Sequence, residues 1–267
     1  MKNLTSLITA IALISILVSC KEEDPEPGML TVRFTEMVDT TNLDYDTVSY
    51  VNEAGNQYMI TEVQYFISNL ALYFEDGTKY EIKDNQGIRY VDSDIPETKY
   101  WVISDDIPCG YVDSVVFTFG LDEETNVSDL FPNPPESNMF WPDELGGGYH
   151  YMKMNGKWLS VNAEINPFNY HLGIGQTYDT TGQVTGFVQN YFKVSVYLAV
   201  YSSFIIMVNP NDTTRLGINM NVNSWFTTPH TWDFDYMPAL MMQNQEAMKT
   251  ACENGFDVFS VGPDYAR

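Results

Sequence analysis

The fold is constrained above all by the alternation of large apolar residues with polar or smaller residues around residue 196. The apolar positions are Phe192, Val194, Val196, Leu198 and Val200, and the positions between them are Lys193, Ser195, Tyr197 and Ala199. A period of two over this length predicts a strand with one face buried and the other exposed. Such a strand needs partner strands, because its backbone groups must form hydrogen bonds.

Several other segments have the composition of strands. They are rich in β-branched and aromatic residues and are bounded by turn residues; they cover residues 31–35, 62–67, 70–74, 79–83, 113–120, 204–208 and 215–221. Asp76-Gly77 lies between two of these runs and is a typical hairpin turn. The segment 204–208 is apolar throughout, which predicts a central strand.

One helix and one long irregular segment interrupt the strands. After Pro238 the apolar residues recur mainly on one helical face, and Gly255 provides a C-terminal stop. Residues 122–148 contain four prolines and a glycine triplet, which are unsuited to a regular sheet. No linker of domain size follows residue 28. The pattern therefore predicts one all-β, β-sandwich-like domain with a short C-terminal helix and a long irregular central loop.

The N-terminus resembles the signal of a bacterial lipoprotein. Lys2 precedes an apolar run over residues 7–18, which is too short to span a bilayer. The run ends in Leu-Val-Ser-Cys, which resembles a lipobox and implies cleavage after residue 19 and lipidation of Cys20. Residues 20–28 are mostly charged, so we expect an acidic, solvated tether between the lipid and the β domain at 29–267.

The residues after the cysteine suggest a cellular address. A lysine followed by acidic residues directly after Cys20 resembles the surface-export signal of Bacteroidetes lipoproteins. That resemblance implies an outer-membrane lipoprotein that faces the periplasm or the cell surface. The acyl chains would hold the protein on the lipid bilayer, because anionic lipid repels an acidic domain.

The composition limits which class of partner the chain can bind and which disulfides it can form. The chain has 36 Asp and Glu against 13 Lys and Arg, for a formal net charge of −23. This balance argues against a nucleic-acid-binding protein, which needs clustered cations to neutralise phosphates. Apart from Cys20, the cysteines are Cys109 and Cys252. In an oxidising compartment they are expected to form one disulfide, and the alternative is two buried free thiols.

No catalytic site is evident in the sequence. Gly146-Gly147-Gly148 precedes a strand-like segment rather than a helix, so it does not fit a phosphate-binding loop. No nucleophile has a recognisable base partner, and the many acidic pairs are expected to be surface charge. The oxygen-rich turns at 179–183 and 209–212 are expected to be plain turns rather than calcium sites. We therefore expect a protein that is not an enzyme.

Several sequence phrases occur in the order found in one protein family. They are Tyr65–Leu70, Phe117–Asp122 followed by Asn126, Met139–Trp141 followed by Gly148–Lys153 and Gly156, Tyr170–Gly173, and the C-terminal stretch from Met241 to Val261. Together they resemble the MbnP-like family of periplasmic or surface copper-binding proteins. The resemblance spans about residues 30–262. It implies a secreted all-β domain that binds copper, in some members through two histidines and a tryptophan oxidised to kynurenine.

Carried over residue by residue, the resemblance implies a copper site around His171 and Trp141. His171 lies in the histidine phrase of the family, and Trp141 corresponds to the tryptophan that is oxidised in some members. Pro142-Asp143 stands where the family has a second aromatic residue. No motif fixes the partner histidine: His150 is the nearest in sequence and His230 is the other choice.

The chemistry of these side chains suits copper. Imidazole binds Cu(II), and thioethers such as those of Met139, Met152 and Met154 bind Cu(I). Because only neutral imidazole binds a metal, copper is expected to leave as the pH falls through the titration range of histidine. We therefore expect a copper-binding lipoprotein that acts in uptake, storage or handoff, with an outer-membrane transporter or a redox protein as its partner.

A second class of function is compatible with the same sequence. Exposed tyrosines and tryptophans could form a surface module that recognises a glycan or a partner lipoprotein. The two hypotheses differ in a geometric prediction. Copper binding needs two imidazole nitrogens near enough to share one ion at about 2 Å each. A surface module without a metal leaves the three histidines far apart.

Overall fold

The computed structural model describes residues 26–47, 50–198 and 206–263. The expected signal peptide, the lipidation site Cys20 and most of the expected tether lie outside the described residues. Within the described ranges, none of the helices has both the length and the apolar character needed to cross a bilayer.

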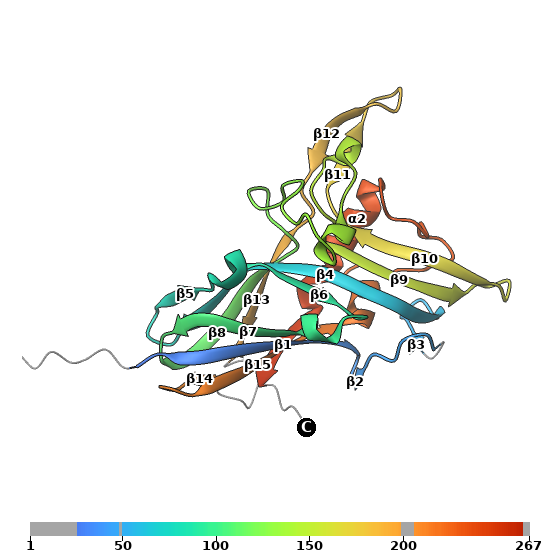
Figure 1. The fold of residues 1–267 in the computed structure, drawn as a ribbon. Helices are drawn as coiled ribbons and strands as arrows, with labels where there is room; N and C mark the ends of the chain where they lie inside the picture. Colours follow the sequence, from blue (N-terminus) through green and yellow to red (C-terminus); the bar gives the residue numbers. More distant parts are fainter. Residues whose placement is uncertain (1–25, 48–49, 199–205, 264–267) are drawn as a thin grey trace, which may run out of the picture.

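Two β-sheets make up the body of the molecule, and their buried side chains share one apolar core (Figure 1). In the first sheet, β1 lies between β15, with which it pairs in parallel, and the antiparallel strand β7. The strands of this sheet are β1 (Gly28–Val38), β2 (Thr41–Asn42), β7 (Tyr100–Ile107), β15 (Thr213–Asn221) and β16 (Phe259–Pro263).

The second sheet is larger and entirely antiparallel, and it is built around β4. Its strands are β3 (Tyr50–Val51), β4 (Gln57–Phe74), β5 (Lys79–Glu81), β6 (Arg89–Asp92), β8 (Gly110–Phe119), β9 (Met152–Leu159), β10 (Ile165–Leu172), β13 (Phe192–Tyr197) and β14 (Ile206–Val208). A separate hairpin of β11 (Gly175–Tyr178) and β12 (Val184–Val188) projects from the body. This architecture confirms the predicted all-β, sandwich-like fold.

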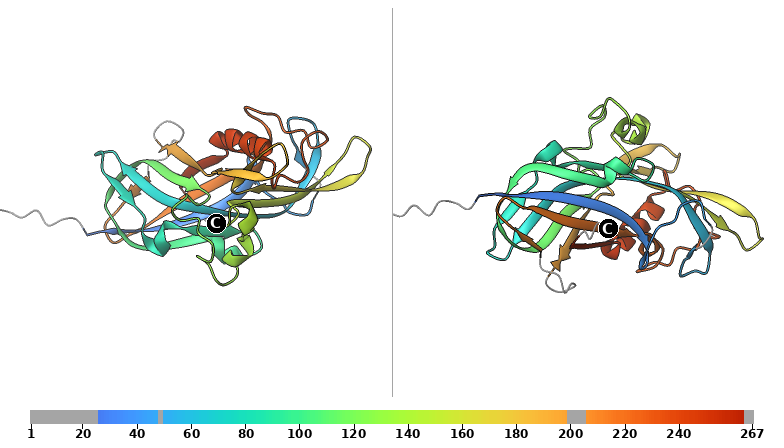
Figure 2. Two further views of the ribbon diagram at one scale, coloured as in Figure 1. Left: turned by 90° about the horizontal axis from the view of Figure 1, so that it is seen from above. Right: turned by 60° about the horizontal axis from the view of Figure 1, so that its bottom comes forward.

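The strand β4 also positions the long irregular segment. It pairs with β9 along its first half and with β8 along its second half. The two neighbours meet at Phe66, whose carbonyl accepts a hydrogen bond from the Gly120 amide at 2.9 Å and whose amide donates to the Tyr151 carbonyl at 3.0 Å. Residues 120–151 therefore leave and rejoin the sheet at one point. Both views in Figure 2 show this segment standing out from one side of the sandwich.

Helical structure is short and lies between strands. The single α-helix described is α2 (Gln245–Asn254), and its N-cap residue Asn244 accepts a hydrogen bond from the Ala247 amide. The short 3-10 helices are η1 (Asp84–Gly87), η2 (Pro96–Lys99), η3 (Glu136–Met139), η4 (Asp143–Leu145), η5 (Val222–Phe226) and η6 (Gly255–Asp257). Helix α2 lies against β10, β11 and η5. The predicted C-terminal helix and its end at Gly255 are confirmed.

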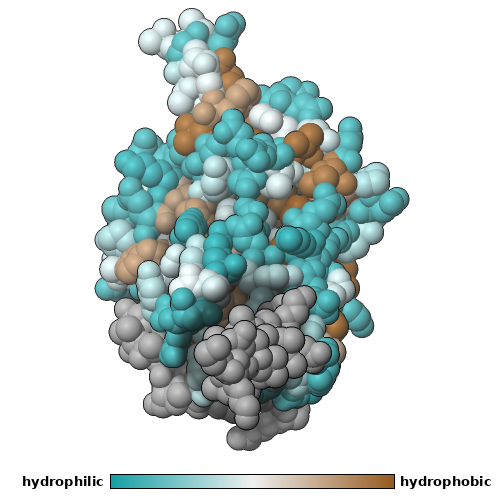
Figure 3. Space-filling model, turned by 90° about the vertical axis from the view of Figure 1, so that its left-hand side faces the viewer, coloured by the Kyte–Doolittle hydropathy of each residue, from teal (hydrophilic) through white to brown (hydrophobic). Residues whose placement is uncertain are grey.

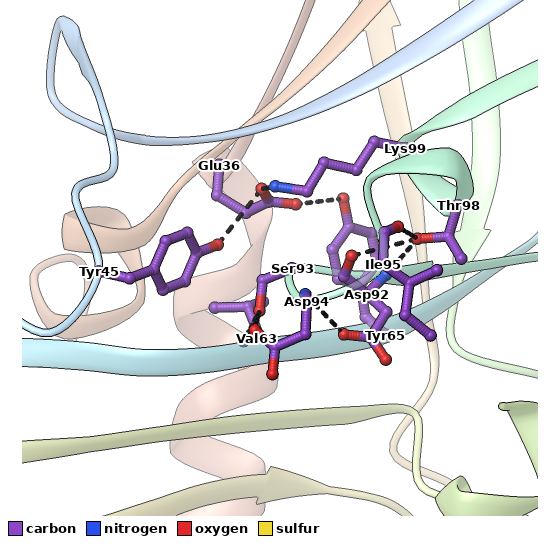
Figure 4. Close-up of polar contacts among 10 residues, drawn as sticks. All are labelled: Glu36, Tyr45, Val63, Tyr65, Asp92, Ser93, Asp94, Ile95, Thr98 and Lys99. Carbon is purple, nitrogen blue, oxygen red and sulfur yellow. Dashed lines mark hydrogen bonds and ion pairs between the residues drawn. The ribbon is translucent and has the colours of Figure 1, made fainter.

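A buried carboxylate joins the two sheets (Figure 4). Glu36 in β1 forms an ion pair with Lys99 at 2.6 Å and accepts hydrogen bonds from Tyr45 and from Tyr65 in β4. Burial and the neighbouring Glu36 raise the pKa of Tyr65, so its hydroxyl stays protonated and donates. A buried charge is tolerated when it is paired and hydrogen-bonded in this way.

The expected disulfide is not formed. Cys109 and Cys252 are both free thiols. Cys109 lies between β7 and β8, where its Sγ donates to the Glu26 carbonyl, whereas Cys252 lies in α2, where its Sγ donates to the Asn190 carbonyl. The two thiols thus have separate partners on different elements, and the alternative of free thiols is the one that the structure adopts.

Candidate metal centre

His171 lies on the polar face of the edge strand β10. The flanking side chains Tyr170 and Leu172 are buried in the core, so the alternation of the strand turns His171 to the other face of the sheet. On the neighbouring strand β9, Lys153 pairs directly with His171, and Asn155 follows on the same face. The His171 side chain therefore faces the segment that covers the outer side of this sheet.

The cover is provided by residues 139–150 of the long irregular segment. Phe140 and Tyr149 form an isolated antiparallel bridge, and the Trp141 amide donates to the Gly148 carbonyl at 2.8 Å. The His150 amide donates to the Met139 carbonyl at 2.6 Å. These contacts make a small hairpin that carries Trp141 on one arm and His150 on the other.

Two glycines allow this hairpin to sit close to the sheet. Gly148 has a φ of +75°, and a Cβ at this position would lie 2.4 Å from the side chain of Asn126. A Cβ on Gly173, just after His171 in the sequence, would lie 2.6 Å from the ring of Trp141. Neither position has room for a larger residue without displacement of its neighbours. The glycines therefore bring Trp141 and His150 down onto the end of β10.

The structure brings three of the four residues predicted for the copper site together. The ring centroids of His150 and His171 are 5.2 Å apart with an interplanar angle of 84°. The rings of Trp141 and His150 are 4.6 Å apart and meet edge to face. His150 and Trp141 are almost fully buried, at 5% and 0% exposure, and His171 is partly buried.

Each histidine uses one ring nitrogen in a hydrogen bond. Nδ1 of His150 donates to the Met139 carbonyl at 2.9 Å, and Nε2 of His171 donates to Oδ1 of Asn155 at 2.8 Å. The acceptors are oxygens, so these nitrogens carry the protons. The remaining nitrogens, Nε2 of His150 and Nδ1 of His171, take no part in these two hydrogen bonds. Unprotonated imidazole nitrogens are the form that binds a metal.

Asn155 is itself held in place. Its Nδ2 donates to Oε2 of Glu62 at 2.7 Å, which fixes the orientation of the amide and leaves Oδ1 directed at His171. A carboxylate, an amide and an imidazole are thereby linked across β4, β9 and β10. Partners of this kind orient metal-ligating histidines in proteins. Sequence reasoning missed both Asn155 and Glu62, although the polar alternation of β9 at residues 153 and 155 was a usable signal.

Both imidazoles are neutral at physiological pH. Burial lowers the pKa of His150 to about 3, with a further contribution from His171 and an opposing one from the Met139 carbonyl. Burial and the nearby Lys153 lower the pKa of His171 to about 4. The two rings are therefore ready to bind a metal well below the usual titration range of histidine.

The other predicted donors are not aimed at this site. Nε2 of His230 contacts Oε2 of Glu253, and the His230 backbone amide donates to Oδ1 of Asn254 at 2.9 Å, at the C-terminal end of α2. Met152 and Met154 are fully buried on the opposite face of β9 from Lys153. The indole N–H of Trp141 donates to the Leu145 carbonyl at 3.1 Å, and an unmodified indole has no lone pair to offer in its place.

The candidate ligand set at this site is therefore two imidazoles. Within the described ranges, no group of three or more His, Cys, Asp or Glu side chains is arranged to hold a metal ion. Two imidazoles suit copper, which ranks highest in affinity among the divalent first-row metals. They would leave coordination positions for a backbone carbonyl, water or a partner's donor group.

Comparison with known proteins identifies relatives of the chain. A family model described as MbnP matches residues 27–245. Among solved structures, the chain is similar to MbnP from Methylosinus trichosporium, with a TM-score of 0.59, 14% sequence identity, and coverage of 89% of this chain and 99% of that chain. At this identity the structural likeness concerns the fold. A search of curated proteins gave no match.

Proposed function

Because the chain belongs to the MbnP family, we propose that it binds copper through His150 and His171, next to Trp141. We further propose that it does so as a lipoprotein of the outer membrane, held by acyl chains on Cys20 and facing the periplasm or the cell surface. Its role there would be uptake, storage or handoff of the ion to a transporter or a redox protein. It would bind and pass on the ion without catalysing a reaction.

The observation that carries this proposal is the convergence of the two imidazoles. His150 comes from the irregular segment and His171 from an edge strand, yet their ring centroids are 5.2 Å apart. Each ring keeps one nitrogen outside the hydrogen bonds to the Met139 carbonyl and to Asn155 Oδ1. The hypothesis of a surface module without a metal requires dispersed histidines, so this contact favours the copper hypothesis.

The surroundings of the two imidazole rings also support the proposal that they bind copper. Folding has buried His150 and partly buried His171 and keeps both imidazoles neutral, so a metal ion displaces no proton from their unprotonated nitrogens at neutral pH. The hydrogen bonds to Met139 and Asn155 hold each ring in one tautomer. Because the two rings are already oriented, less free energy is lost in ordering them when the ion binds.

Copper retention after dialysis tests the site. The protein, produced without its signal peptide, is mixed with excess copper and dialysed, and the bound copper is counted per chain. We expect about one ion per chain in the wild type, as a single pair of imidazoles predicts. His171→Ala and His150→Ala are expected to abolish retention.

His230→Ala is the matched control, because it removes the remaining histidine of the chain. We expect this variant to retain copper like the wild type, since His230 is paired with Glu253 outside the cluster. Retention by His171→Ala, or loss of copper from His230→Ala alone, would show that the ion binds elsewhere.

A further inference from the structure

A groove of about 490 Å³ lies on the outer face of the second sheet, away from the histidines. Its floor is formed by Ala71 and Tyr73 of β4 and by Val116 and Thr118 of β8. Register places Ala71 beside Val116, and Phe117, which lies between Val116 and Thr118 in sequence, is buried in the core. Because the side chain of Ala71 is small, it leaves open space above the sheet between β5 and β8, the strand on the far side of the floor.

Three lysines from separate parts of the chain line this groove. Lys79 is in β5, Lys83 follows β5, and Lys193 is in β13, more than a hundred residues further on. All three side chains are exposed. The whole chain has 13 Lys and Arg against 36 Asp and Glu, so three cations around one groove are a marked local departure from its composition.

The two carboxylates of the groove, Glu81 and Asp122, offset only part of the charge of the three lysines. Glu81 forms an ion pair with Lys79. Asp122 accepts hydrogen bonds from Asn69 Nδ2 and from Thr125 Oγ1, each at 2.7 Å. Within the part of the chain that the structure describes, Lys83 and Lys193 form no ion pair. Their charges are therefore available to an incoming anion.

The rim of the groove is held in an unusual backbone conformation. Asn69 and Gln86, which line it, have φ values of 54° and 58° although neither is a glycine. The Asn69 amide is fixed by Asp122 and by Thr118 Oγ1. Residues in the left-handed region cost free energy and gather at ligand-binding sites, where the surrounding structure holds them.

We propose that this groove is a second binding site, separate from the histidine pair, for a small organic anion that carries several carboxylate groups. Its volume lies within the range of about 300–1,000 Å³ that is typical of small-molecule sites. Ammonium groups on opposite walls favour a ligand with more than one negative group. The ring of Tyr73 on the floor favours a ligand with a flat, apolar centre.

A titration with benzene-1,3,5-tricarboxylate tests the proposal, because this probe has three carboxylates on a flat ring. The copper-free protein is titrated by calorimetry in buffer of low ionic strength. We expect saturable binding of one probe per chain, which weakens as sodium chloride is added. The double variant Lys83→Gln/Lys193→Gln is expected to bind at least about tenfold more weakly.

Lys157→Gln is the matched control, since it removes an exposed lysine of β9 outside the groove. It is expected to change the affinity for the probe less than about twofold, as a distant screened charge should. His171→Ala is expected to bind the probe normally, and the double lysine variant is expected to retain copper, so failure of one site is distinguished from failure of the other. Absence of saturable binding, or equal weakening by Lys157→Gln, would overturn the proposal.

Discussion

At the scale of single residues, Asn155 is not a candidate metal ligand, but its hydrogen bond to His171 affects how that histidine can bind a metal. Its Oδ1 accepts a hydrogen bond from His171 Nε2–H, which keeps the proton on Nε2 and so leaves Nδ1 as the nitrogen that can bind a metal. We expect Asn155→Leu to lower copper affinity about tenfold or more, because such partners are worth about 10–100-fold in metal affinity. Competition with a copper chelator measures the change.

Asn166→Leu provides the control on the same pair of strands. Asn166 lies in β10 beside Trp158, and its amide donates to the Glu164 carbonyl rather than to a histidine. This variant is expected to keep wild-type affinity. Equal affinities of Asn155→Leu and wild type would show that the orientation of His171 does not depend on Asn155.

The lowered pKa of His150 predicts how the stability of the copper-free protein depends on pH. In the unfolded chain the imidazole titrates near its usual pKa of about 6.5, whereas the folded protein holds it neutral down to a pKa of about 3. Between these values the unfolded state binds more protons, so stability falls as the pH falls. One such histidine contributes a slope of up to about 1.4 kcal/mol per pH unit.

Urea denaturation of the copper-free protein at pH 7, 6 and 5 measures this dependence. We expect His150→Phe, which keeps an aromatic ring but removes the titrating group, to lose less stability than wild type over the same interval. Parallel losses in the two proteins would mean that His150 is not held neutral by the fold.

The candidate residues could be named from sequence phrases, but their roles could not. His171 and Trp141 stood in family phrases, and His150 was nearest to them in sequence. The choice between His150 and His230 depended on a hairpin whose path no local pattern encodes. Asn155 acquires its role only when β9 and β10 pair, because the contact with His171 joins positions 16 residues apart.

At the scale of elements, the fit between the hairpin of residues 139–150 and the end of β10 depends on Gly173. We expect Gly173→Ala to destabilise the protein by about 1–3 kcal/mol, as overpacking a closed site does, because the new methyl would overlap the Trp141 ring. Displacement of Trp141 should also disturb His150, so copper retention is expected to fall. Thermal unfolding and the dialysis assay measure the two effects.

Gly262→Ala is the control for this substitution, since a Cβ there would meet no atom within 4 Å. It is expected to change stability by less than about 0.5 kcal/mol, as open surface substitutions do. If Gly173→Ala behaved like Gly262→Ala, the close approach of Trp141 to β10 would be wrong.

The sequence predicts which segments form strands, but it predicts less well where the strands begin and end and which strands pair. The two strands predicted at 62–67 and 70–74 are one strand, β4, because the polar break at Asn69 is a bulge with a φ of 54° rather than a turn. The helix begins only at Gln245, since Leu240 forms an isolated bridge with Asn169 instead. The apolar segment expected to be central pairs, as β14, with β8 alone among the described strands.

At the scale of the whole molecule, the separate positions and partners of the two free cysteines predict a chain without an internal cross-link. Burial raises the pKa of Cys252 to about 12, so this thiol should resist alkylation in the folded protein at neutral pH. After unfolding without a reductant, we expect both Cys109 and Cys252 to react with iodoacetamide in a chain that begins after Cys20. Mass spectrometry counts the modified thiols, and their absence in the unfolded chain would indicate the disulfide after all.

The proposed function depends on segments that only the complete fold brings together. The sheet presents His171, and the irregular segment, which rejoins the sheet beside Phe66 in the middle of β4, brings His150 to it. A mostly hydrophilic face, seen with the β11–β12 hairpin at the top in Figure 3, surrounds the few apolar areas of that side. The excess of acidic residues in the chain and the histidine pair are both consistent with the proposed binding of a cation.

The most direct test is the location of copper in crystals of the copper-loaded protein, by anomalous scattering at the copper absorption edge. We predict one strong peak at about 2 Å from Nε2 of His150 and from Nδ1 of His171. A peak at His230 and Glu253 instead, or none near the two imidazoles at full copper loading, would contradict the proposed site.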